Sequence, residues 1–378
     1  MQRFDVAIVG AGIVGLAHAW MAVRRGLSVV LFDRSPRAQG ATVRNFGMIW
    51  PIGQTAGEGY EIALRSRELW LELNEAGVVN ADRCGTVHLA HRNDELAVLE
   101  QFAAGDTHTC QLLSRDETIK LAPIANPDGL LGGLWSDTEL RVDPRTAANN
   151  IATWLVDNHS VQRQFSTQIV RVEDGRLFAA DGQCWEADRT IVCSGSDLQT
   201  LFPETLAQSG LKLCKLQMLR TIGQPNVKQE AHVASGLTLR HYTSFNHCPA
   251  LEALKQRVAN ESPELDQYGI HVMATQSADG SFILGDSHEY DEKIEPFDKS
   301  EIDDLILREL RKIITLPDWT ITERWHGIYS KNSDVMIFEA EPEPNIHVSV
   351  GPGGAGMTMS FGLADRFWNR TFGTTNRH

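Results

Sequence analysis

The stretch DVAIVGAGIVGLAHAWMAVRRGLSVVLFDRS, Asp5 to Ser35, decides the fold that this sequence predicts. Val6 to Val9 is a continuous apolar run, which is typical of a parallel strand buried on both faces. The apolar residues that follow have the spacing of one helix face, and they are Ile13, Leu16, Ala17 and Trp20. Gly26 is expected to stop that helix, and Val29 to Phe32 to form a second strand. The stretch therefore predicts a strand–helix–strand unit.

The glycines between the first strand and the helix each have a physical task. Gly10 permits the tight turn out of the strand, and Gly12 lets a pyrophosphate approach the backbone. Gly15 lets the helix pack closely on the sheet. The start of the helix then presents free N–H groups and a partial positive charge to the phosphates. This pattern indicates a dinucleotide site.

Asp33 stands at the end of the second expected strand, 18 residues after Gly15. A carboxylate at this place accepts hydrogen bonds from a ribose diol. The strand, turn, helix and acid fall in the order that dinucleotide binding requires. An adenine-ribose pocket does not separate FAD from NAD, so the rest of the chain has to decide between them.

Composition and charge exclude several classes of protein. The chain has 378 residues and a formal net charge of −14, which argues against a nucleic-acid-binding surface. No apolar run approaches the ~20 residues of a membrane span, and the first residues carry no targeting signal. We therefore expect a cytoplasmic protein. The six cysteines are scattered, without a CxxC pair or histidines at zinc spacing, so we expect reduced thiols, mostly buried, and no metal site.

Hydrophobic patterns predict further elements along the chain. Helices are expected over 144–156 and 300–314, the second with Ser300 as N-cap. Expected strands cover 168–172, 176–180, 190–193, 237–245, 270–286 and 346–350. Turns at Asp174-Gly175 and Asp279-Gly280 divide two of these regions into hairpins. A glycine loop after residue 350 is expected to lead into a last helix.

Six separated stretches resemble the D-amino-acid oxidase superfamily of FAD-dependent amine oxidases, the group of glycine oxidase and sarcosine oxidase. The first is the opening motif. The others are ATVRNFGMIWP (41–51), IVCSGS (191–196), DGSFILGD (279–286), RWHGIYSKNSD (324–334) and GPGGAGMTMS (351–360). The overall pattern is also similar to FAD oxidoreductases associated with bacterial aminophosphonate catabolism. Together the stretches favour FAD over NAD.

The resemblance implies an α/β fold, with a Rossmann-type FAD-binding domain and an inserted mixed-sheet substrate domain of α+β character. The expected FAD-binding domain is discontinuous and takes residues 1–80, 141–205 and 325–378. The expected substrate domain takes residues 81–140 and 206–324. The glycine-rich segments at the two ends of the chain would then meet in space.

The resemblance also implies which residues bind FAD. The candidates are Gly10, Gly12, Ile13, Val14, Gly15, Asp33, Arg34, Thr42, Arg44, Asn45, Phe46, Gly47, Met48, Val170, Ser194, Gly195, Gly353, Gly354, Ala355, Gly356, Met357 and Thr358. Backbone amides of the C-terminal glycine loop would stabilise negative charge on the reduced flavin. Sarcosine oxidases tether the flavin through a cysteine, and no cysteine here lies near the C-terminal flavin segments, so we expect non-covalent FAD.

Two departures from the family concern the substrate. Glycine-oxidase-like members place an arginine after W-x-G-x to bind the substrate carboxylate, and this chain has Tyr329 there. The lysine of the sarcosine oxidases' C-terminal loop is replaced by Thr358. A polar substrate end still needs a partner once desolvated. Candidate catalytic or substrate-binding residues are Arg44, His326, Tyr329 and Lys331, together with the run Arg240-His241-Tyr242.

Each of these candidates also has a structural interpretation. Arg44 is expected near the flavin face, but arginine equally suits the FAD pyrophosphate or a surface ion pair. His326 is as consistent with a packed histidine as with a site residue, and Lys331 with a solvated surface lysine. The sequence leaves these alternatives open.

The expected activity is oxidation of the C–N bond of a small primary or N-methylated amine with an anionic end, an amino acid or an aminophosphonate. The products would be an imine, then an aldehyde or keto acid, with O2 as acceptor and H2O2 formed. No side-chain base is obligatory, because the cofactor carries the chemistry. A dehydrogenase that uses a quinone or carrier, and a non-catalytic flavoprotein subunit, are the alternatives. The oligomeric state is left open.

Overall fold

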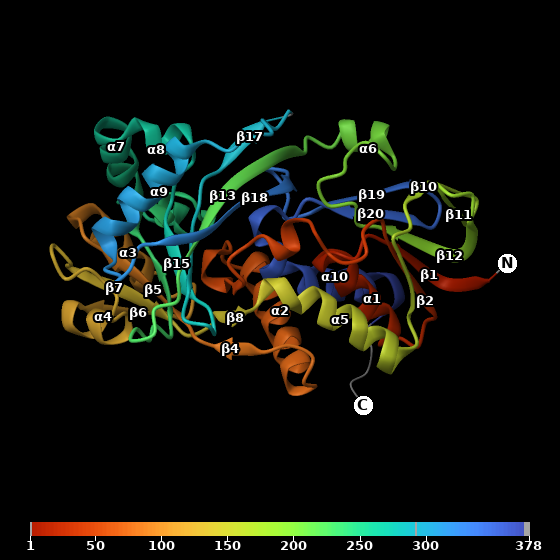
Figure 1. Ribbon diagram of the computed structural model, residues 1–378, viewed down its shortest axis with the longest axis horizontal. Helices are drawn as coiled ribbons and strands as arrows, with labels where there is room; N and C mark the ends of the chain where they lie inside the picture. Colours follow the sequence, from red (N-terminus) through yellow and green to blue (C-terminus); the bar gives the residue numbers. More distant parts are fainter. Residues whose placement is uncertain (1, 292, 374–378) are drawn as a thin grey trace.

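The computed structural model describes residues 2–291 and 293–373, and it places two large sheets side by side along the longest axis (Figure 1). The parallel strands of the first sheet run in the spatial order β20 (Ile346–Val350), β12 (Cys184–Val192), β1 (Arg3–Val9), β2 (Val29–Asp33) and β9 (Gln162–Phe165). Antiparallel strands β10 (Ile169–Glu173), β11 (Arg176–Ala179) and β19 (Phe338–Glu343) extend it. This is the Rossmann-type order expected from the opening motif.

The helices of this half are α1 (Ile13–Val23), α2 (Glu58–Glu75), α5 (Pro144–His159) and α10 (Gly356–Phe372), with the short α6 (Pro203–Ala207) apart from them. The helix α1 contacts both α5 and α10, and α10 also contacts α2. Apolar residues of α1 and α10 share one buried core with β1 and β2. The two ends of the chain therefore meet in one domain.

The second sheet is mixed and runs in the order β17 (Glu289–Asp291), β13 (Lys212–Thr221), β16 (Phe282–Gly285), β15 (Met273–Gln276), β14 (His232–Ala234), β5 (Thr86–Ala90), β7 (Gly132–Ser136) and β6 (Gln111–Ser114), and β18 (Ile321–Lys331) also pairs with β13. Its helices are α3 (Asn93–Ala104), α4 (Arg115–Leu121), α7 (Leu251–Glu261), α8 (Pro263–Gln267) and α9 (Ser300–Ile313). A small sheet of β3 (Met48–Ile49), β8 (Leu140–Val142) and β4 (Ala81–Arg83) lies between the halves.

The tight turn after β1 shows why the glycines are needed. Gly10 has a φ of +107°, and a Cβ added there would lie 2.2 Å from the carbonyl oxygen of Cys193. A Cβ on Gly15 would lie 1.8 Å from the carbonyl oxygen of Gly10. Both distances are too short for a side chain, so α1 packs directly against the turn as the spacing of the motif predicts.

Several expected elements are confirmed. The helix expected over 144–156 is α5, which continues to His159. The hairpin at Asp174-Gly175 is β10 and β11, and the strands expected at 190–193 and 346–350 are parts of β12 and β20. The region 270–286 contains the antiparallel strands β15 and β16 around the turn at Asp279-Gly280.

Two expectations about local structure were wrong. Residues 237–245 form no strand but the 3-10 turns η3 (Gly236–Arg240) and η4 (Thr243–His247). Local hydrogen bonds hold this segment, including the one from the Thr238 hydroxyl to the Ser235 carbonyl oxygen (2.5 Å), so its alternating leucines do not pair with a sheet. Ser300 is the first residue of α9 rather than its N-cap, which is Lys299 without a side-chain hydrogen bond.

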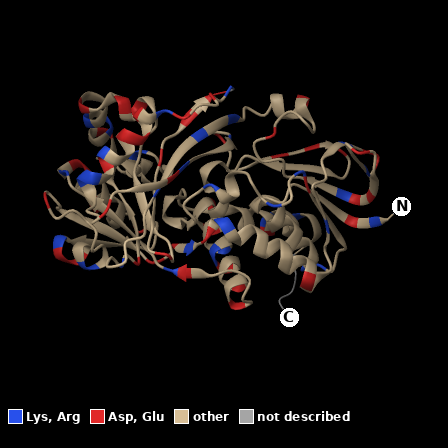
Figure 2. Cartoon of the chain, in the orientation of Figure 1, with Lys and Arg blue, Asp and Glu red and all other residues tan. Residues whose placement is uncertain are grey.

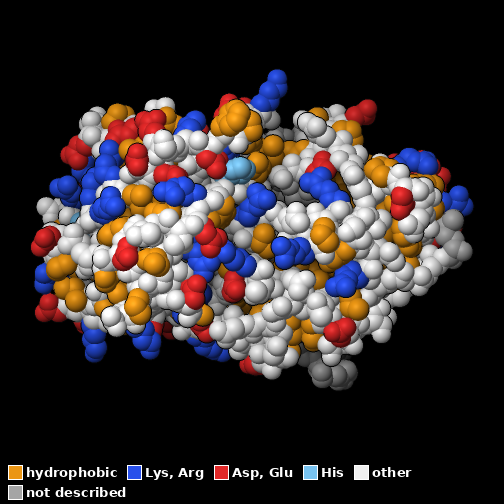
Figure 3. All heavy atoms as spheres, in the orientation of Figure 1, with side chains coloured by type: hydrophobic (Ala, Val, Ile, Leu, Met, Phe, Trp, Pro, Cys, Tyr) orange, Lys and Arg blue, Asp and Glu red, His pale blue; other side chains and the backbone are white. Residues whose placement is uncertain are grey.

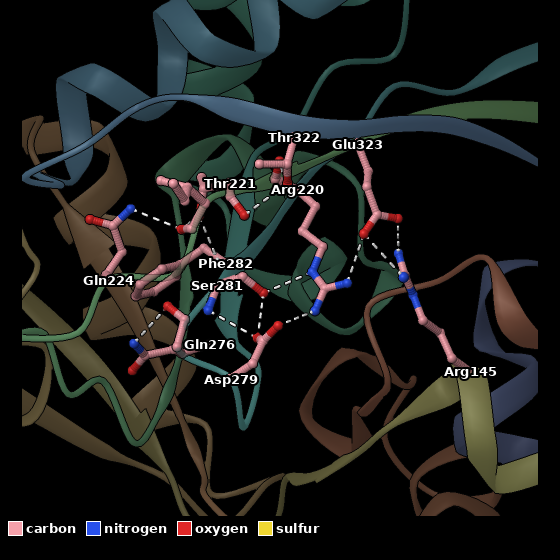
Figure 4. Close-up of polar contacts among 12 residues, drawn as sticks. Arg145, Arg220, Thr221, Gln224, Gln276, Asp279, Ser281, Phe282, Thr322 and Glu323 are labelled. Atoms are coloured by element: carbon pink, nitrogen blue, oxygen red, sulfur yellow. Dashed lines mark hydrogen bonds and ion pairs between the residues drawn. The ribbon is translucent and has the colours of Figure 1, made fainter.

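Polar contacts join the two halves where β18 approaches α5 (Figure 4). Arg220 of β13 donates to Asp279 (2.7 Å), to the Ser281 hydroxyl (2.8 Å) and to Glu323 of β18 (2.8 Å). Glu323 also accepts from Arg145 of α5 (2.7 Å). Glu323 thus connects the second sheet to α5 of the Rossmann half.

The expected division into domains stays a prediction. The two large sheets take their strands from alternating segments of the chain, in an order similar to the expected one. The boundary expected at residue 325 falls inside β18, which pairs with β13 along its length as far as Lys331. The second sheet therefore extends past that boundary.

Charged residues of both signs are distributed over the molecule (Figure 2), and they are interspersed on the face drawn in Figure 3. Within the described residues, no helix combines the length and apolar character needed to cross a membrane. All six cysteines are free, and four of them are buried.

Candidate active site

A cavity of about 960 Å³ lies between the two halves of the molecule. Its wall takes residues from the β1 turn, the segment 38–59, the end of β12, the strand β18 and the C-terminal glycine loop, as well as from the second sheet. Predicted residues that line it are Gly10, Gly12, Ile13, Val14, Asp33, Arg34, Thr42, Arg44, Asn45, Phe46, Met48, Ser194, Gly195, Tyr329, Lys331, Gly353, Gly354, Ala355, Gly356, Met357 and Thr358. The cavity is therefore where most candidate residues meet.

One end of the cavity is formed by the β1 turn and Asp33. The Asp33 carboxylate accepts hydrogen bonds from the backbone N–H groups of Ala11 (2.8 Å) and Ser35 (2.8 Å), which fix its position at the end of β2. Gly12 is the N-cap of α1 and supplies no side-chain cap. A Cβ at Gly12 would lie 3.2 Å from the Thr42 hydroxyl. The N–H of Ile13 donates to that hydroxyl (3.0 Å), and Gly12 brings no side chain of its own where a pyrophosphate would approach.

The glycine loop before α10 forms another part of the wall. Gly353 has a φ of +61°, and a Cβ there would lie 3.1 Å from the Lys331 side chain. Like α1, α10 begins without a side-chain cap, since its N-cap is Ala355. Two helix starts whose N-cap residues supply no side-chain hydrogen bond lie at one cavity, and they suit a ligand that carries phosphates and an electron-accepting ring. The residues present therefore fit FAD.

Two cations line the cavity without a carboxylate partner. Arg44 donates to the backbone oxygen of His326 (3.2 Å), and among the described residues no Asp or Glu lies within ion-pair distance of it. The same holds for Lys331, whose Nζ lies 5.7 Å from the centre of the Tyr290 ring. A bridge between Lys331 and Pro352 places this lysine beside the glycine loop. By contrast, Arg34 pairs with Asp197 (2.9 Å).

Tyr329 lies against the same loop. A Cβ on Gly354 would lie 3.4 Å from its hydroxyl oxygen, and the side chain is buried. Burial raises the pKa of Tyr329 well above its usual value, and the neighbouring Cys214 and Tyr290 add to this. The hydroxyl therefore stays protonated and is available as a hydrogen-bond donor.

The half of the molecule that contains the second sheet contributes three histidines to the cavity wall. His241, His271 and His288 line the cavity together with Asp286 and Tyr242. Burial lowers the pKa of each histidine, that of His288 to about 3, and raises the pKa of Asp286 well above its usual value. This part of the wall is polar but carries little charge.

Only His241 of this group was among the candidates. His271 and His288 lie just outside β15 and β16, and these strands pair antiparallel with Met273 opposite Gly285. His271, just before β15, therefore lies close to Asp286 and His288, just after β16. The stretches GIHVM and GDSHEY at the ends of one hairpin were the signal that could have found them.

Five predicted residues do not line the cavity, and one of them is Arg240, which pairs with Asp266. His326 turns to the other side of β18, where it pairs with Asp298 (2.9 Å), so the structure does not support a place for it in the site. The Val170 side chain is 41% exposed, and its neighbours Gln168 and Ile169 line the cavity instead. Gly15 and Gly47 lie behind the wall, because a Cβ at Gly47 would meet the carbonyl oxygen of Val142 at 2.0 Å.

A known family accounts for this arrangement. The family model described as FAD dependent oxidoreductase matches residues 5–367 of the chain. The chain belongs to this family. FAD is therefore the cofactor of this protein, and the resemblance to the D-amino-acid oxidase superfamily is confirmed.

The chain matches curated relatives over part of their length. It is 27% identical to N-methyl-L-tryptophan oxidase of Escherichia coli over 55% of this chain and 58% of the relative. It is 29% identical to monomeric sarcosine oxidase of a Bacillus species over 51% of this chain and 52% of the relative. The chain thus spans a little over half the length of these relatives.

Solved structures show the same fold. The structure of glycine oxidase from Geobacillus kaustophilus superposes with a TM-score of 0.77 at 17% identity, and covers the whole of both chains (100% of each). This likeness confirms the Rossmann-type FAD-binding half with its second, mixed sheet.

Proposed function

We propose that this FAD-dependent oxidoreductase oxidises the C–N bond of a small primary or N-methylated amine that has an anionic end. The substrate class includes amino acids and aminophosphonates such as N-methyl-aminoethylphosphonate. The amine loses a hydride and a proton to give an imine, and water then converts the imine to an aldehyde or keto acid and releases an amine. The relatives named as sarcosine and N-methyl-L-tryptophan oxidases support the N-methylated amine.

The proposal rests on two cationic side chains of the cavity wall that have no carboxylate partner among the described residues. Arg44 and Lys331 line the same cavity as the glycine loop, and the described residues offer neither of them a carboxylate. A cation that a bound ligand shields from water is stabilised by an opposite charge. A carboxylate or phosphonate of the substrate would supply it, and the arginine fork can hold either group through two hydrogen bonds.

The chain's own residues would bind and orient the substrate. Arg44 would hold the anionic end, and the protonated hydroxyl of Tyr329 would donate a hydrogen bond beside the glycine loop. FAD, when bound, accepts two electrons and passes them to O2, which gives H2O2. The little-charged histidine wall favours the neutral form of the amine, from which hydride leaves most readily.

We further propose that FAD is bound without a covalent bond. Cys193 lines the cavity, but burial raises the pKa of its thiol far above the usual range. Cys214, beside Tyr329, has a pKa raised to about 12, mainly by burial. Neither thiol is present as a thiolate near neutral pH, so neither is an effective nucleophile. Acid precipitation should therefore release all of the flavin into the supernatant.

A substrate screen under air tests the proposed activity. Purified, FAD-loaded protein is mixed with glycine, sarcosine, aminoethylphosphonate and its N-methyl form, and H2O2 is measured. We expect peroxide from at least one of these amines. Flavin that is reduced by an amine without peroxide formation would instead indicate a dehydrogenase with a quinone or carrier acceptor. Flavin that no amine reduces would overturn the proposed substrate class.

A further inference from the structure

Three histidines of the second sheet converge on one point of the cavity wall. His241 follows η3, His271 precedes β15 and His288 follows β16. A nitrogen from each ring lies within 4.8 Å of the nitrogens of the other two. The Asp286 carboxylate joins them, with one oxygen 3.4 Å from Nε2 of His271 and the other 3.8 Å from Nε2 of His288.

Several polar atoms of this cluster are buried without a hydrogen-bond partner. Both ring nitrogens of His271 and one oxygen of Asp286 have none among the described residues. The two residues are only 2% and 5% exposed. Buried polar groups are nearly always paired in folded proteins, so the orphaned Nε2 of His271 and Oδ1 of Asp286, which lie 3.4 Å apart, indicate a missing ligand.

The hydrogen bond of His288 decides which of its atoms is free. Its Nδ1 lies 3.3 Å from the carbonyl oxygen of Gly269, which can only accept, so Nδ1 carries the proton. The lone pair of Nε2 then points toward Asp286. A ring held by a carbonyl on one nitrogen and bare on the other is the usual arrangement of a metal-binding histidine.

We propose that His241, His271, His288 and Asp286 bind one divalent transition-metal ion of the Zn²⁺ class. Imidazole nitrogens with a single carboxylate suit Zn²⁺ and its neighbours better than Mg²⁺ or Ca²⁺, which prefer oxygen. Zn–N bonds of about 2.0 to 2.1 Å place the ligand nitrogens about 3.4 Å apart. Rotation of the rings about χ2, a soft torsion, brings the nitrogens together to that spacing.

Two cationic side chains, Arg240 and Lys331, act on the cluster, and Asp286 is the acidic residue within it. Arg240 is paired with Asp266 and hydrogen-bonded to the carbonyl oxygen of Ile270, so its charge is largely compensated. Ionised Asp286 would neutralise part of the charge of the ion.

A metal here would have a function for the substrate, and this step rests on the proposed function. All four ligand residues line the cavity, so an ion held by them could expand its coordination to a fifth position on the side that faces the substrate. An anionic amine could then place its carboxylate or phosphonate on the ion, with Arg44 and Lys331 as further partners.

Metal titration of the FAD-loaded protein tests the site. After treatment with a chelator and dialysis, Zn²⁺ is added in a calorimeter and the bound metal is counted by elemental analysis. We expect one ion per chain. His271→Ala and His288→Ala should each weaken binding by about tenfold to hundredfold, whereas the matched control His326→Ala, outside the cluster, should bind as the wild type does.

Co²⁺ gives a second readout that does not depend on the variants folding. Bound to these ligands it should show the intense visible absorption of a four-coordinate site, lost again on adding excess Zn²⁺. Wild-type protein that takes up neither ion, or both variants with FAD content and Zn²⁺ binding unchanged, would overturn the proposal. Metal uptake by a protein whose flavin no amine reduces would uphold the site and refute only the proposed function.

Discussion

Gly10 and Gly26 share a backbone conformation but differ in what surrounds them. Both have a positive φ, +107° and +74°. A Cβ would lie 2.2 Å from the Cys193 carbonyl oxygen at Gly10 and would meet nothing within 4 Å at Gly26. We expect Gly10→Ala to lower the free energy of unfolding by about 3 kcal/mol or more and to lose FAD, because the turn must move.

Gly26→Ala is the matched control for this prediction. It should cost only the strain of the left-handed backbone, about 1 kcal/mol, and keep its FAD. Urea unfolding and the flavin absorbance of purified protein measure both effects. Equal losses in the two variants would show that the close approach at Gly10 has no importance beyond its φ.

Arg44 offers a prediction about substrate affinity. If its guanidinium holds the anionic end, Arg44→Ala should raise the KM for an anionic amine by about tenfold to hundredfold, since a hydrogen bond to a charged group contributes about 1.5 to 3 kcal/mol. FAD content should be unchanged. Arg324→Ala, whose side chain pairs with Asp303 on the outside of β18, should leave both quantities unaltered.

The flavin colour separates the two interpretations of Arg44. Colourless Arg44→Ala protein would assign this arginine to the pyrophosphate of FAD. An unchanged KM with full FAD content would show that the anionic end lies elsewhere in the cavity.

At the scale of the elements, Glu323 connects β18 and β13 with α5. It accepts hydrogen bonds from Arg220 (2.8 Å) and from Arg145 (2.7 Å), and its side chain is 43% exposed. Because this site is partly exposed, we expect Glu323→Gln to lower the free energy of unfolding by only about 1 kcal/mol, and less at high salt. Urea unfolding at two ionic strengths measures this.

Glu341→Gln serves as the control, because Glu341 is 61% exposed and lies 3.9 Å from Arg189. That change should stay within about 0.5 kcal/mol of the wild type. A loss at Glu323 that is no larger than the loss at Glu341 would contradict a connecting role for this contact.

The elements also show what the sequence could reveal. The opening unit was predictable, because the order of strand, glycines, helix and acid has few physical alternatives. The strand predicted at 237–245 was wrong. Alternating leucines fit a strand, but Ser and Thr hydroxyls can also hold the backbone in local turns.

The candidate site was predictable only in part. Residues of the glycine loops were found because they belong to continuous motifs. His271, Asp286 and His288 were not, because they meet only through the pairing of β15 with β16, and that register is invisible in a single sequence. His326 was predicted in the site but does not line the cavity. The side of β18 that it faces depends on the same kind of strand pairing.

At the scale of the whole molecule, buried histidines set the response to acid. Burial lowers the pKa to about 3 for His18, His88, His232 and His288. In the unfolded chain they take up protons near pH 6.5. Below that pH the unfolded state binds more protons than the folded state, so the free energy of unfolding falls as the pH falls from 6.5 toward 3.

Carboxyls with raised pKa values, Glu95, Glu139, Asp286 and Asp303, act in the opposite direction, but they are fewer than the nine histidines of the described residues whose pKa is lowered. Urea unfolding should therefore show a net loss of at least about 2 kcal/mol between about pH 7.5 and about pH 5. His88→Phe, which removes one of these histidines, should flatten the dependence. Equal stability at both pH values would contradict the neutral burial of these rings.

The central claim concerns the whole molecule, because both halves must cooperate to oxidise an anionic amine. The most direct measurement is anaerobic stopped-flow mixing of the FAD-loaded protein with N-methyl-aminoethylphosphonate or sarcosine, each compared with an uncharged N-methylamine of similar size. We predict saturable bleaching of the visible flavin band, with the anionic amines saturating at concentrations at least about tenfold lower. Bleaching by none of the amines, or equal saturation by charged and uncharged ones, would contradict it.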